Sequence, residues 1–208
     1  MLGDLAGKTI LDISCGSGAK DVELLERGAA EVVGIDIAGH FVTSGDQRLT
    51  LAQGDLSQLD EVPAIRGRSF DRILFLQSLG YATDQARTLR AARELLSVDG
   101  FIVVVRSHPI RFAVERAKKN GTMIGEEYFK TEPYSYPSGW NEQVTVTHRV
   151  NTVADMVNVF AAAGLWIEEA VEPQLSPENR RRFPHKQAWL DEHLGVIMFK
   201  LRPVHPSR

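Results

Sequence analysis

The sequence predicts an α/β fold in which helices cover both faces of a doubly wound, mostly parallel sheet. Short apolar segments such as residues 70–76 and 101–105 alternate with helical patterns along the chain. Strands that are apolar on both faces are typical of a parallel sheet buried between two layers of helices. A loop with two glycines follows the first apolar segment, and such loops commonly bind ligands in folds of this class.

The first half of the chain contains the most regular part of this pattern. We expect a buried strand over residues 9–14 and a helix over residues 19–27, which ends at Gly28. The further elements expected here are strands over residues 31–36, 49–53, 70–76 and 101–105 and a helix over residues 85–96. That second helix carries its apolar side chains on one face, which favours packing against the sheet.

After residue 108 the alternation of strands and helices is interrupted. A short helix is expected over residues 111–119, and residues 143–149 alternate in the manner of a half-exposed strand. Between them, residues 121–139 are rich in Gly, Pro, Tyr and Glu. We therefore expect an inserted segment at about residues 109–149.

Regular order resumes in the last third of the chain. A helix is expected over residues 152–163, with Thr152 as its N-cap. Strands over residues 165–171 and 194–201 follow, joined by a polar stretch with several prolines. No repeat or linker divides the sequence, so we expect a single domain over residues 1–208, with the inserted segment as its substrate lid.

Composition narrows the class of protein. The chain has 208 residues, 43% of them hydrophobic, and a formal net charge of −3, which gives no basic excess of the kind that nucleic-acid-binding surfaces show. The basic residues 180–186 are expected to form a solvated loop, and a site for an acidic substrate or phosphate is the alternative. A single cysteine, Cys15, rules out an intrachain disulfide.

The same survey predicts where the protein works. There is no signal sequence at the N-terminus, and no apolar run approaches the ~20 residues that span a bilayer. We expect a soluble, cytoplasmic protein with no membrane or nucleic-acid partner and no metal site. The oligomeric state is left open, with a homodimer among the options.

The glycine loop has the sequence "ILDISCGSG" and is followed by a helix. A dinucleotide fingerprint would place glycines at three positions. Gly16 and Gly18 fit, but the third position is Asp21, which is too large and carries the wrong charge to lie against a pyrophosphate. A phosphate-binding P-loop is also disfavoured, because no G-K-[ST] follows.

This loop instead resembles the first motif of the class I S-adenosylmethionine (SAM)-dependent methyltransferases. In that motif an apolar strand carries an acid, here Asp12, before G-x-G; Ser14 departs from the glycine of many members. Further segments that resemble the family, in its order and spacing, are "VVGIDI", "AQGDLS", "SFDRILFLQSLGYATD", "ARELLSVDGFIVVV" and "VADMVNVFAAAGLWIEEAVEP". The resemblance covers most of the chain outside residues 109–149. It implies a seven-stranded Rossmann-like sheet, SAM as cofactor and S-adenosylhomocysteine as product.

The resemblance also implies a set of cofactor-binding residues. Asp36 would accept hydrogen bonds from both ribose hydroxyls, since an ionised carboxylate is an acceptor only. Asp55 would contact the adenine amino group with Leu56 beside the ring, although an isolated Asp at this position is most often a turn residue. The full set is Asp12, Ser14, Cys15, Gly16, Ser17, Gly18, Asp36, Ile37, Gly54, Asp55, Leu56, Leu76 and Gln77.

Two departures from the family affect the pocket. Only "MLGDLAGK" precedes the first strand, where many members carry helices that fold over SAM. The segment between Asp36 and Asp55 leaves room for at most a turn or two of helix. We therefore expect the inserted segment to cover the methyl group, with Tyr128 and Trp140 among its substrate-binding aromatic residues.

Methyl transfer is a direct displacement, so the protein mainly holds the acceptor in line and excludes water. A base is needed only if the attacking atom carries a proton. The candidate catalytic residues are Tyr81, His108 and His148, and Tyr81 is also a candidate for substrate binding. We expect transfer of a methyl group from SAM to an O or N atom of a small-molecule acceptor. The alternatives are a non-catalytic SAM-binding regulatory or interaction protein and a nicotinamide-dependent Rossmann oxidoreductase.

Overall fold

A computed structural model describes residues 1–137, 143 and 145–204 of the chain. Its main sheet has seven strands in the order β3-β2-β1-β4-β5-β9-β8, and only β9 runs antiparallel to its neighbours. This confirms the predicted α/β class with a mostly parallel, seven-stranded sheet. The strands are β1 (Thr9–Ile13), β2 (Glu31–Asp36), β3 (Leu49–Gln53), β4 (Phe70–Leu76), β5 (Leu96–Ser107), β8 (Leu165–Val171) and β9 (Val196–Pro203).

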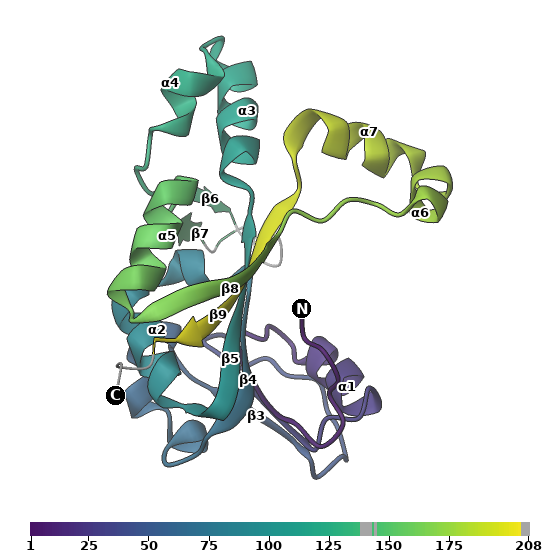
Figure 1. Cartoon of the computed structure of the whole chain (residues 1–208), viewed down its shortest axis with the longest axis vertical. Helices are drawn as coiled ribbons and strands as arrows, with labels where there is room; N and C mark the ends of the chain where they lie inside the picture. The colour runs from purple at the N-terminus through teal and green to yellow at the C-terminus, as the bar shows by residue number, and fades with distance from the viewer. Residues whose placement is uncertain (138–142, 144, 205–208) are drawn as a thin grey trace.

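Helices cover both faces of the sheet (Figure 1). On one face α1 (Ala19–Glu26) packs over an apolar cluster that includes Leu24 and Leu25. On the other face lie α2 (Gln85–Glu94), α5 (Val153–Ala162) and the 3₁₀ turns η1 (Leu56–Glu61), η2 (Pro63–Ile65) and η3 (Leu79–Tyr81). The apolar stripes of these helices and the two-sided strands thus form two core layers, one on each side of the sheet.

The inserted segment is more ordered than the sequence predicts. It contains α3 (Pro109–Asn120), the short helix α4 (Ile124–Tyr128) and a two-stranded sheet of β6 (Tyr134–Pro137) and β7 (Thr145–His148). Neither α4 nor β6 is among the elements that the sequence predicts. The buried carboxylate of Glu127 explains α4, because it accepts hydrogen bonds from the side chains of Lys130 and Thr122, both at 2.7 Å.

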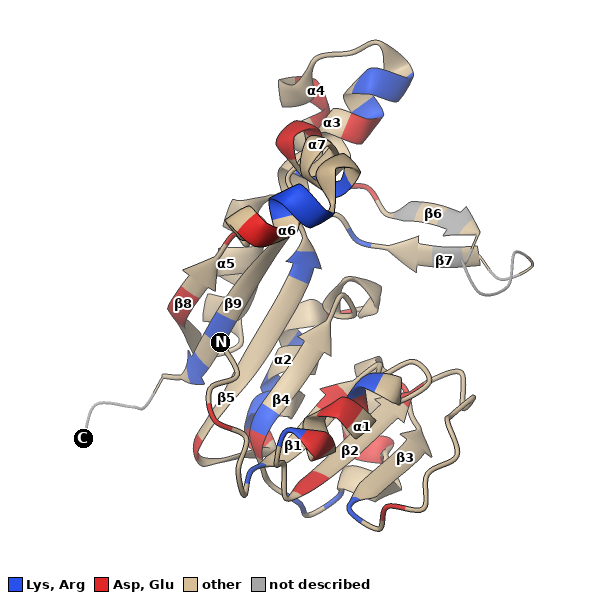
Figure 2. Ribbon diagram, turned by 90° about the vertical axis from the view of Figure 1, so that its right-hand side faces the viewer, with Lys and Arg blue, Asp and Glu red and all other residues tan. Residues whose placement is uncertain are grey.

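The polar stretch between β8 and β9 also forms helices, α6 (Pro177–Arg182) and α7 (Pro184–His193). Each begins with a proline, whose fixed φ and missing N–H suit the first turn of a helix. The Lys and Arg side chains of this arm are exposed, as expected, but on helices and not in a loop (Figure 2). No helix in the described part of the chain is both long and apolar enough to cross a membrane.

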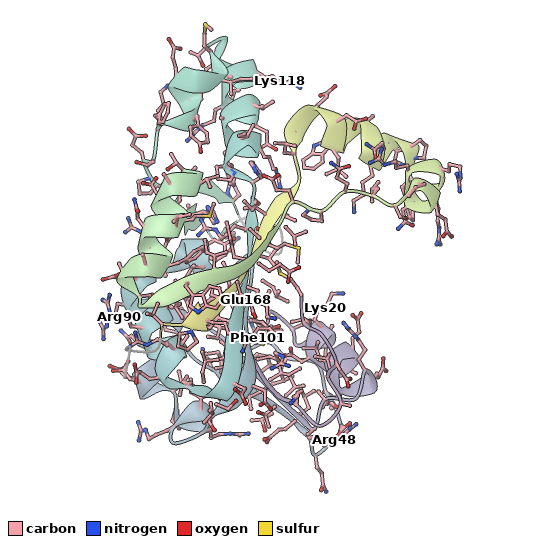
Figure 3. The ribbon with its side chains drawn as sticks, in the orientation of Figure 1. Lys20, Arg48, Arg90, Phe101, Lys118 and Glu168 are labelled. Carbon is pink, nitrogen blue, oxygen red and sulfur yellow. The ribbon has the colours of Figure 1, made fainter. Side chains whose placement is uncertain are left out.

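The arm touches the inserted segment through α7 and α3. Lys118, labelled in Figure 3, forms an ion pair with Glu192 at 2.7 Å. The guanidinium of Arg111 lies over the ring of Trp189, 5.0 Å from its centroid. The inserted segment starts where β5 ends, and the arm ends where β9 begins. Because β5 and β9 are neighbours in the sheet, the two segments lie together beyond the carboxyl ends of the parallel strands (Figure 1).

The apolar core under α5 should contribute strongly to the stability of the fold. Phe160 is fully buried and packs edge-on against Phe199 with ring centroids 5.1 Å apart. We expect Phe160→Ala to lower the free energy of unfolding by about 3–5 kcal/mol, measured by urea denaturation, because it leaves a large cavity. Val157→Ala, on the same helix but 40% exposed, should change it by less than about 0.5 kcal/mol. Equal effects of the two substitutions would contradict this assignment of the core.

Candidate functional site

The chain reverses sharply at the carboxyl ends of the two central strands. Ser14 after β1 and Gln77 after β4 both have φ of +66°, a left-handed conformation that costs a non-glycine residue about 1–2 kcal/mol. The neighbouring strands hold both turns, since Ser14 N donates to Ile35 O at 2.7 Å and Gln77 N to Val105 O at 2.9 Å. Ser14 therefore takes the backbone conformation that glycine adopts readily at this position.

The glycine loop is fastened to the end of β2 by Asp36. Its Oδ2 accepts a hydrogen bond from Gly16 N at 2.9 Å, and its Oδ1 accepts one from Ala38 N at 2.8 Å. Each carboxylate oxygen can accept a second hydrogen bond, so the geometry leaves capacity for the two hydroxyls of a ribose. A Cβ at Gly16 would meet nothing within 4 Å, whereas one at Gly18 would lie 2.6 Å from Leu51. Gly16 thus borders open space and Gly18 faces the protein.

The residues predicted to surround the adenine differ in whether their side chains are exposed to solvent. Asp55 caps η1, with its Oδ1 accepting from Ser57 N at 2.8 Å. Leu56 packs into the core and is only 9% exposed, so it does not present its side chain as the resemblance implies. Ile37 is 66% exposed and supplies the apolar surface beside Asp36. The segment from residue 37 to residue 48 contains no helix in the structure, within the limit of a turn or two that its length predicts.

Two acids are buried beneath the loop. Asp12 and Asp21 are almost fully shielded from solvent, and Asp12 Oδ1 and both carboxylate oxygens of Asp21 have no hydrogen-bond partner among the described residues. Burial raises the pKa of Asp12 well above its usual range and that of Asp21 to about 6, so the pair holds a proton near neutral pH. Asp21 lies under the loop and within reach of any Cβ at Gly34, not at the ligand face where the dinucleotide comparison placed it.

Cys15 lies in the same layer. Burial and the nearby charge of Asp21 raise the pKa of its thiol, which therefore stays protonated. The side chain comes within van der Waals reach of any Cβ at Gly34, so Cys15 acts in packing and not as a nucleophile. Its backbone N–H donates to Ile35 O at 3.0 Å and helps to shape the loop.

A pocket of about 410 Å³ opens next to the turn at Gln77. It is enclosed by η3, the end of β5, α3 and β7, through the residues Gln77, Tyr81, Ser107, Arg111, Phe112, Glu115 and His148. Two contacts fix its polar wall. Ser107 Oγ donates to Gln77 Oε1 at 3.2 Å, and Arg111 Nε donates to Glu115 Oε1 at 2.9 Å.

His148 forms the aromatic wall of this pocket. It is 5% exposed, and its ring lies 5.2 Å from Tyr81 and 5.7 Å from Phe112, measured between centroids. A Cβ at Gly80 would lie 2.2 Å from His148 Nε2, so only glycine lets the ring approach so closely. Burial, and secondarily the charge of Arg106, lower the pKa of His148 to about 4, so the imidazole is neutral at pH 7.

The other candidate residues lie elsewhere. His108 Nδ1 caps α3 by accepting from Ile110 N at 3.2 Å, so Nε2 carries the hydrogen and donates to Glu172 at 2.8 Å. Tyr128 hydroxyl accepts from Val153 N at 3.1 Å, and the residue does not line the pocket. Trp140 lies outside the described residues. The structure therefore brings Tyr81 and His148 together and leaves His108 and Tyr128 apart from them.

Three pocket residues on α3 were missed by sequence reasoning, Arg111, Phe112 and Glu115. A signal was present, because Arg111 and Glu115 are spaced by four and share one face of the helix. Among the described residues, no group of His, Cys, Asp and Glu side chains is arranged to hold a metal ion.

Part of the chain is similar to a known family of domains. Residues 11–104 match the family model for a methyltransferase domain. A Haemophilus influenzae protein described as uncharacterized is 26% identical over 221 residues, covering 98% of this chain and 84% of that protein. The ubiquinone biosynthesis O-methyltransferase of Neisseria meningitidis is 29% identical over 106 residues, which are 48% of this chain and 44% of that enzyme. This chain thus matches less than half the length of that enzyme.

Solved structures agree on the fold. The crystal structure of an S-adenosylmethionine-dependent methyltransferase from Mesorhizobium loti superposes with a TM-score of 0.71 at 20% identity, covering 96% of this chain and 92% of that one. The shared architecture therefore extends through the inserted segment and the arm, beyond the part that the family model matches.

Cofactor affinity tests the role of Asp36. We expect Asp36→Ala to weaken SAM binding about tenfold or more in calorimetry, since a hydrogen bond to a charged group is worth about 1.5–3 kcal/mol. Asp55→Ala should have a smaller effect, because one bond is lost. Asp46→Ala removes a surface acid that pairs with Arg48 and should leave affinity unchanged. An Asp36 variant with wild-type affinity would remove this residue from the ribose site.

The buried acid pair gives stability a defined pH dependence. Its folded-state pKa values are raised, so the free energy of unfolding should fall as pH rises from about 4 through about 6. We expect Asp21→Asn to flatten this curve and to be more stable than the wild type at pH 7, by an amount that shrinks at about pH 4. The stability of Asp60→Asn, a substitution at an exposed acid, should depend on pH as that of the wild type does. The same pH dependence in Asp21→Asn would disprove the claim that the buried pair holds a proton.

Proposed function

We propose that this chain, which is a class I SAM-dependent methyltransferase with SAM as its cofactor, transfers the methyl group to an O or N atom of a small-molecule acceptor. One observation carries the proposal. Gln77, at the end of β4 where the family places the methionine part of SAM, also lines the 410 Å³ pocket. The pocket therefore opens at the place where the methyl group would be presented.

The cofactor would lie across the ends of the first strands. Asp36 and the backbone around Gly16 would hold the ribose and the adjacent chain of SAM, and Ile37 and Asp55 would flank the adenine. SAM supplies an activated methyl group on its sulfonium, so these residues need only bind and orient the molecule. We propose that Ser14, Ser17, Gly54 and Leu76 shape the same cleft through their positions at strand ends.

The acceptor would occupy the pocket between Tyr81 and His148. A pocket of this volume, enclosed by aromatic rings and a few polar groups, suits a compact organic molecule. Support also comes from the ubiquinone biosynthesis O-methyltransferase of Neisseria meningitidis, whose name describes methylation of oxygen. The neutral imidazole of His148 would orient the attacking atom by a hydrogen bond. Its low pKa makes it a weak base, so it is poorly suited to accept a proton from the acceptor.

The inserted segment would form the cover of this pocket. It contributes Phe112 from α3 and His148 from β7, and the arm supports α3 through Trp189 and Glu192. Tyr128 would act indirectly, by anchoring the start of α5 through its hydroxyl.

Two measurements test this function. Calorimetry should show binding of SAM and S-adenosylhomocysteine but not of NAD, and S-adenosylhomocysteine should accumulate when an acceptor panel of small phenols and amines is supplied with SAM. Binding of SAM without turnover of any acceptor would favour a non-catalytic SAM-binding protein. Binding of NAD and not of SAM would contradict the proposal altogether.

His148→Gln separates binding from turnover. We expect kcat to fall about 10- to 100-fold, the loss that corresponds to one or two orienting hydrogen bonds, while SAM affinity stays within twofold. His185→Gln, on the exposed surface of α7, serves as the matched control and should change neither. If His148→Gln lowers SAM affinity as much as turnover, the residue belongs to the cofactor site and the acceptor pocket is misplaced.

A further inference from the structure

Arg106, near the end of β5, is a buried cation without a balancing anion. It is 3% exposed. Its Nη2 donates to Arg149 O at 2.8 Å and to Asn151 Oδ1 at 3.2 Å, while Nε and Nη1 have no partner among the described residues. No carboxylate in the described part of the chain forms an ion pair with it. An unpaired buried charge is strongly unfavourable, and a protein that keeps one has a use for it.

The charge lies near His148, which lines the acceptor pocket, because Arg106 Nη2 donates to the backbone oxygen of Arg149, the next residue in the chain. It interacts electrostatically with Tyr81 of η3 and with His148 of β7, and both residues line the pocket. A charge in this buried setting is poorly screened.

The other pocket groups leave this charge uncancelled. Arg111 and Glu115 pair with each other and contribute no net charge. His148 is neutral, because burial and Arg106 lower its pKa to about 4, and the remaining lining groups are polar or aromatic. The sulfonium of SAM would add a second positive charge at the pocket mouth. The electrostatic field in the pocket therefore favours an anion and opposes an ammonium group.

We infer that Arg106 makes this pocket selective for an acceptor whose attacking atom is an ionised oxygen, as in a phenol or enol. The inference rests on the proposed methyl transfer and narrows its acceptor from O or N to an acidic hydroxyl. Arg106 is a specificity-determining residue that acts through Tyr81 and His148 and need not touch the acceptor.

The chemistry balances without a base at the transfer step. The acceptor hydroxyl gives its proton to solvent on binding. One electron pair of the oxyanion then forms the bond to the methyl carbon as the carbon–sulfur bond breaks, and sulfur keeps that electron pair in S-adenosylhomocysteine. No proton remains on the methylated oxygen, which agrees with a His148 that stays neutral.

The ionisation of a chromophoric phenol, 4-nitrophenol, tests the inference without turnover. The probe is titrated by absorbance in the presence of the full chain saturated with S-adenosylhomocysteine. We expect the pKa of the bound phenol to fall by about one unit or more relative to the free phenol, as a nearby unpaired cation requires. Arg106→Gln should abolish this shift, and Arg106→Lys should retain part of it. Arg72→Gln, a matched substitution on β4 in which the lost guanidinium stacks on Phe101, should leave the shift intact.

The wild-type protein alone gives a second readout. 4-Nitrophenol should bind at least about tenfold more tightly than 4-nitrobenzylamine, which carries a positive charge at neutral pH. Equal binding of the two probes, no measurable binding of 4-nitrophenol, or an unshifted pKa of the bound phenol would overturn the inference. So would an Arg106→Gln variant that unfolds more easily while the phenol pKa stays shifted, because Arg106 would then be structural. If the wild-type protein does not bind S-adenosylhomocysteine, the proposed function itself would be contradicted.

Discussion

The carboxylate of Asp36 holds together the part of the structure on which the rest depends. It joins the end of β2 to Gly16 of the glycine loop, while the backbone at Ser14 and Gln77 turns through a left-handed conformation on the adjacent strands. These turns are local strain, which the parallel sheet supports through the hydrogen bonds of Ile35 O and Val105 O. These contacts fix the glycine loop and the turn at Gln77 at the carboxyl ends of β1, β2 and β4.

The pocket proposed for the acceptor is formed largely by segments outside the main sheet. The inserted segment supplies α3 and β7, and the arm between β8 and β9 braces α3 through Trp189 and Glu192. Arg111 is central to this junction, since it pairs with Glu115 in the pocket and stacks on Trp189 of the arm. The division suits a family in which one cofactor serves many acceptors, because loops beyond the strand ends can change without disturbing the cofactor cleft.

Sequence reasoning succeeded where local pattern and tertiary environment agree. Two-sided apolar strands such as Phe70–Leu76 can only be buried, and Asp36 lies at the end of β2, where the sheet fixes its geometry. Sequence reasoning failed where contacts beyond the local pattern determine the structure. Glu127 organises α4 through a buried carboxylate network, and residues 180–186, expected to form a solvated loop, belong mostly to α6 and α7. His108 and Tyr128 looked functional by residue type, but each spends its polar atoms on the backbone or on a nearby acid.

The central claim is that cofactor cleft and acceptor pocket meet at Gln77. A crystal structure of the chain with S-adenosylhomocysteine tests it most directly. The account predicts ribose hydroxyls on the Asp36 carboxylate and the sulfur at the mouth of the pocket that Tyr81 and His148 enclose. A complex in which the ligand binds away from Asp36, or in which the sulfur faces away from that pocket, would contradict it.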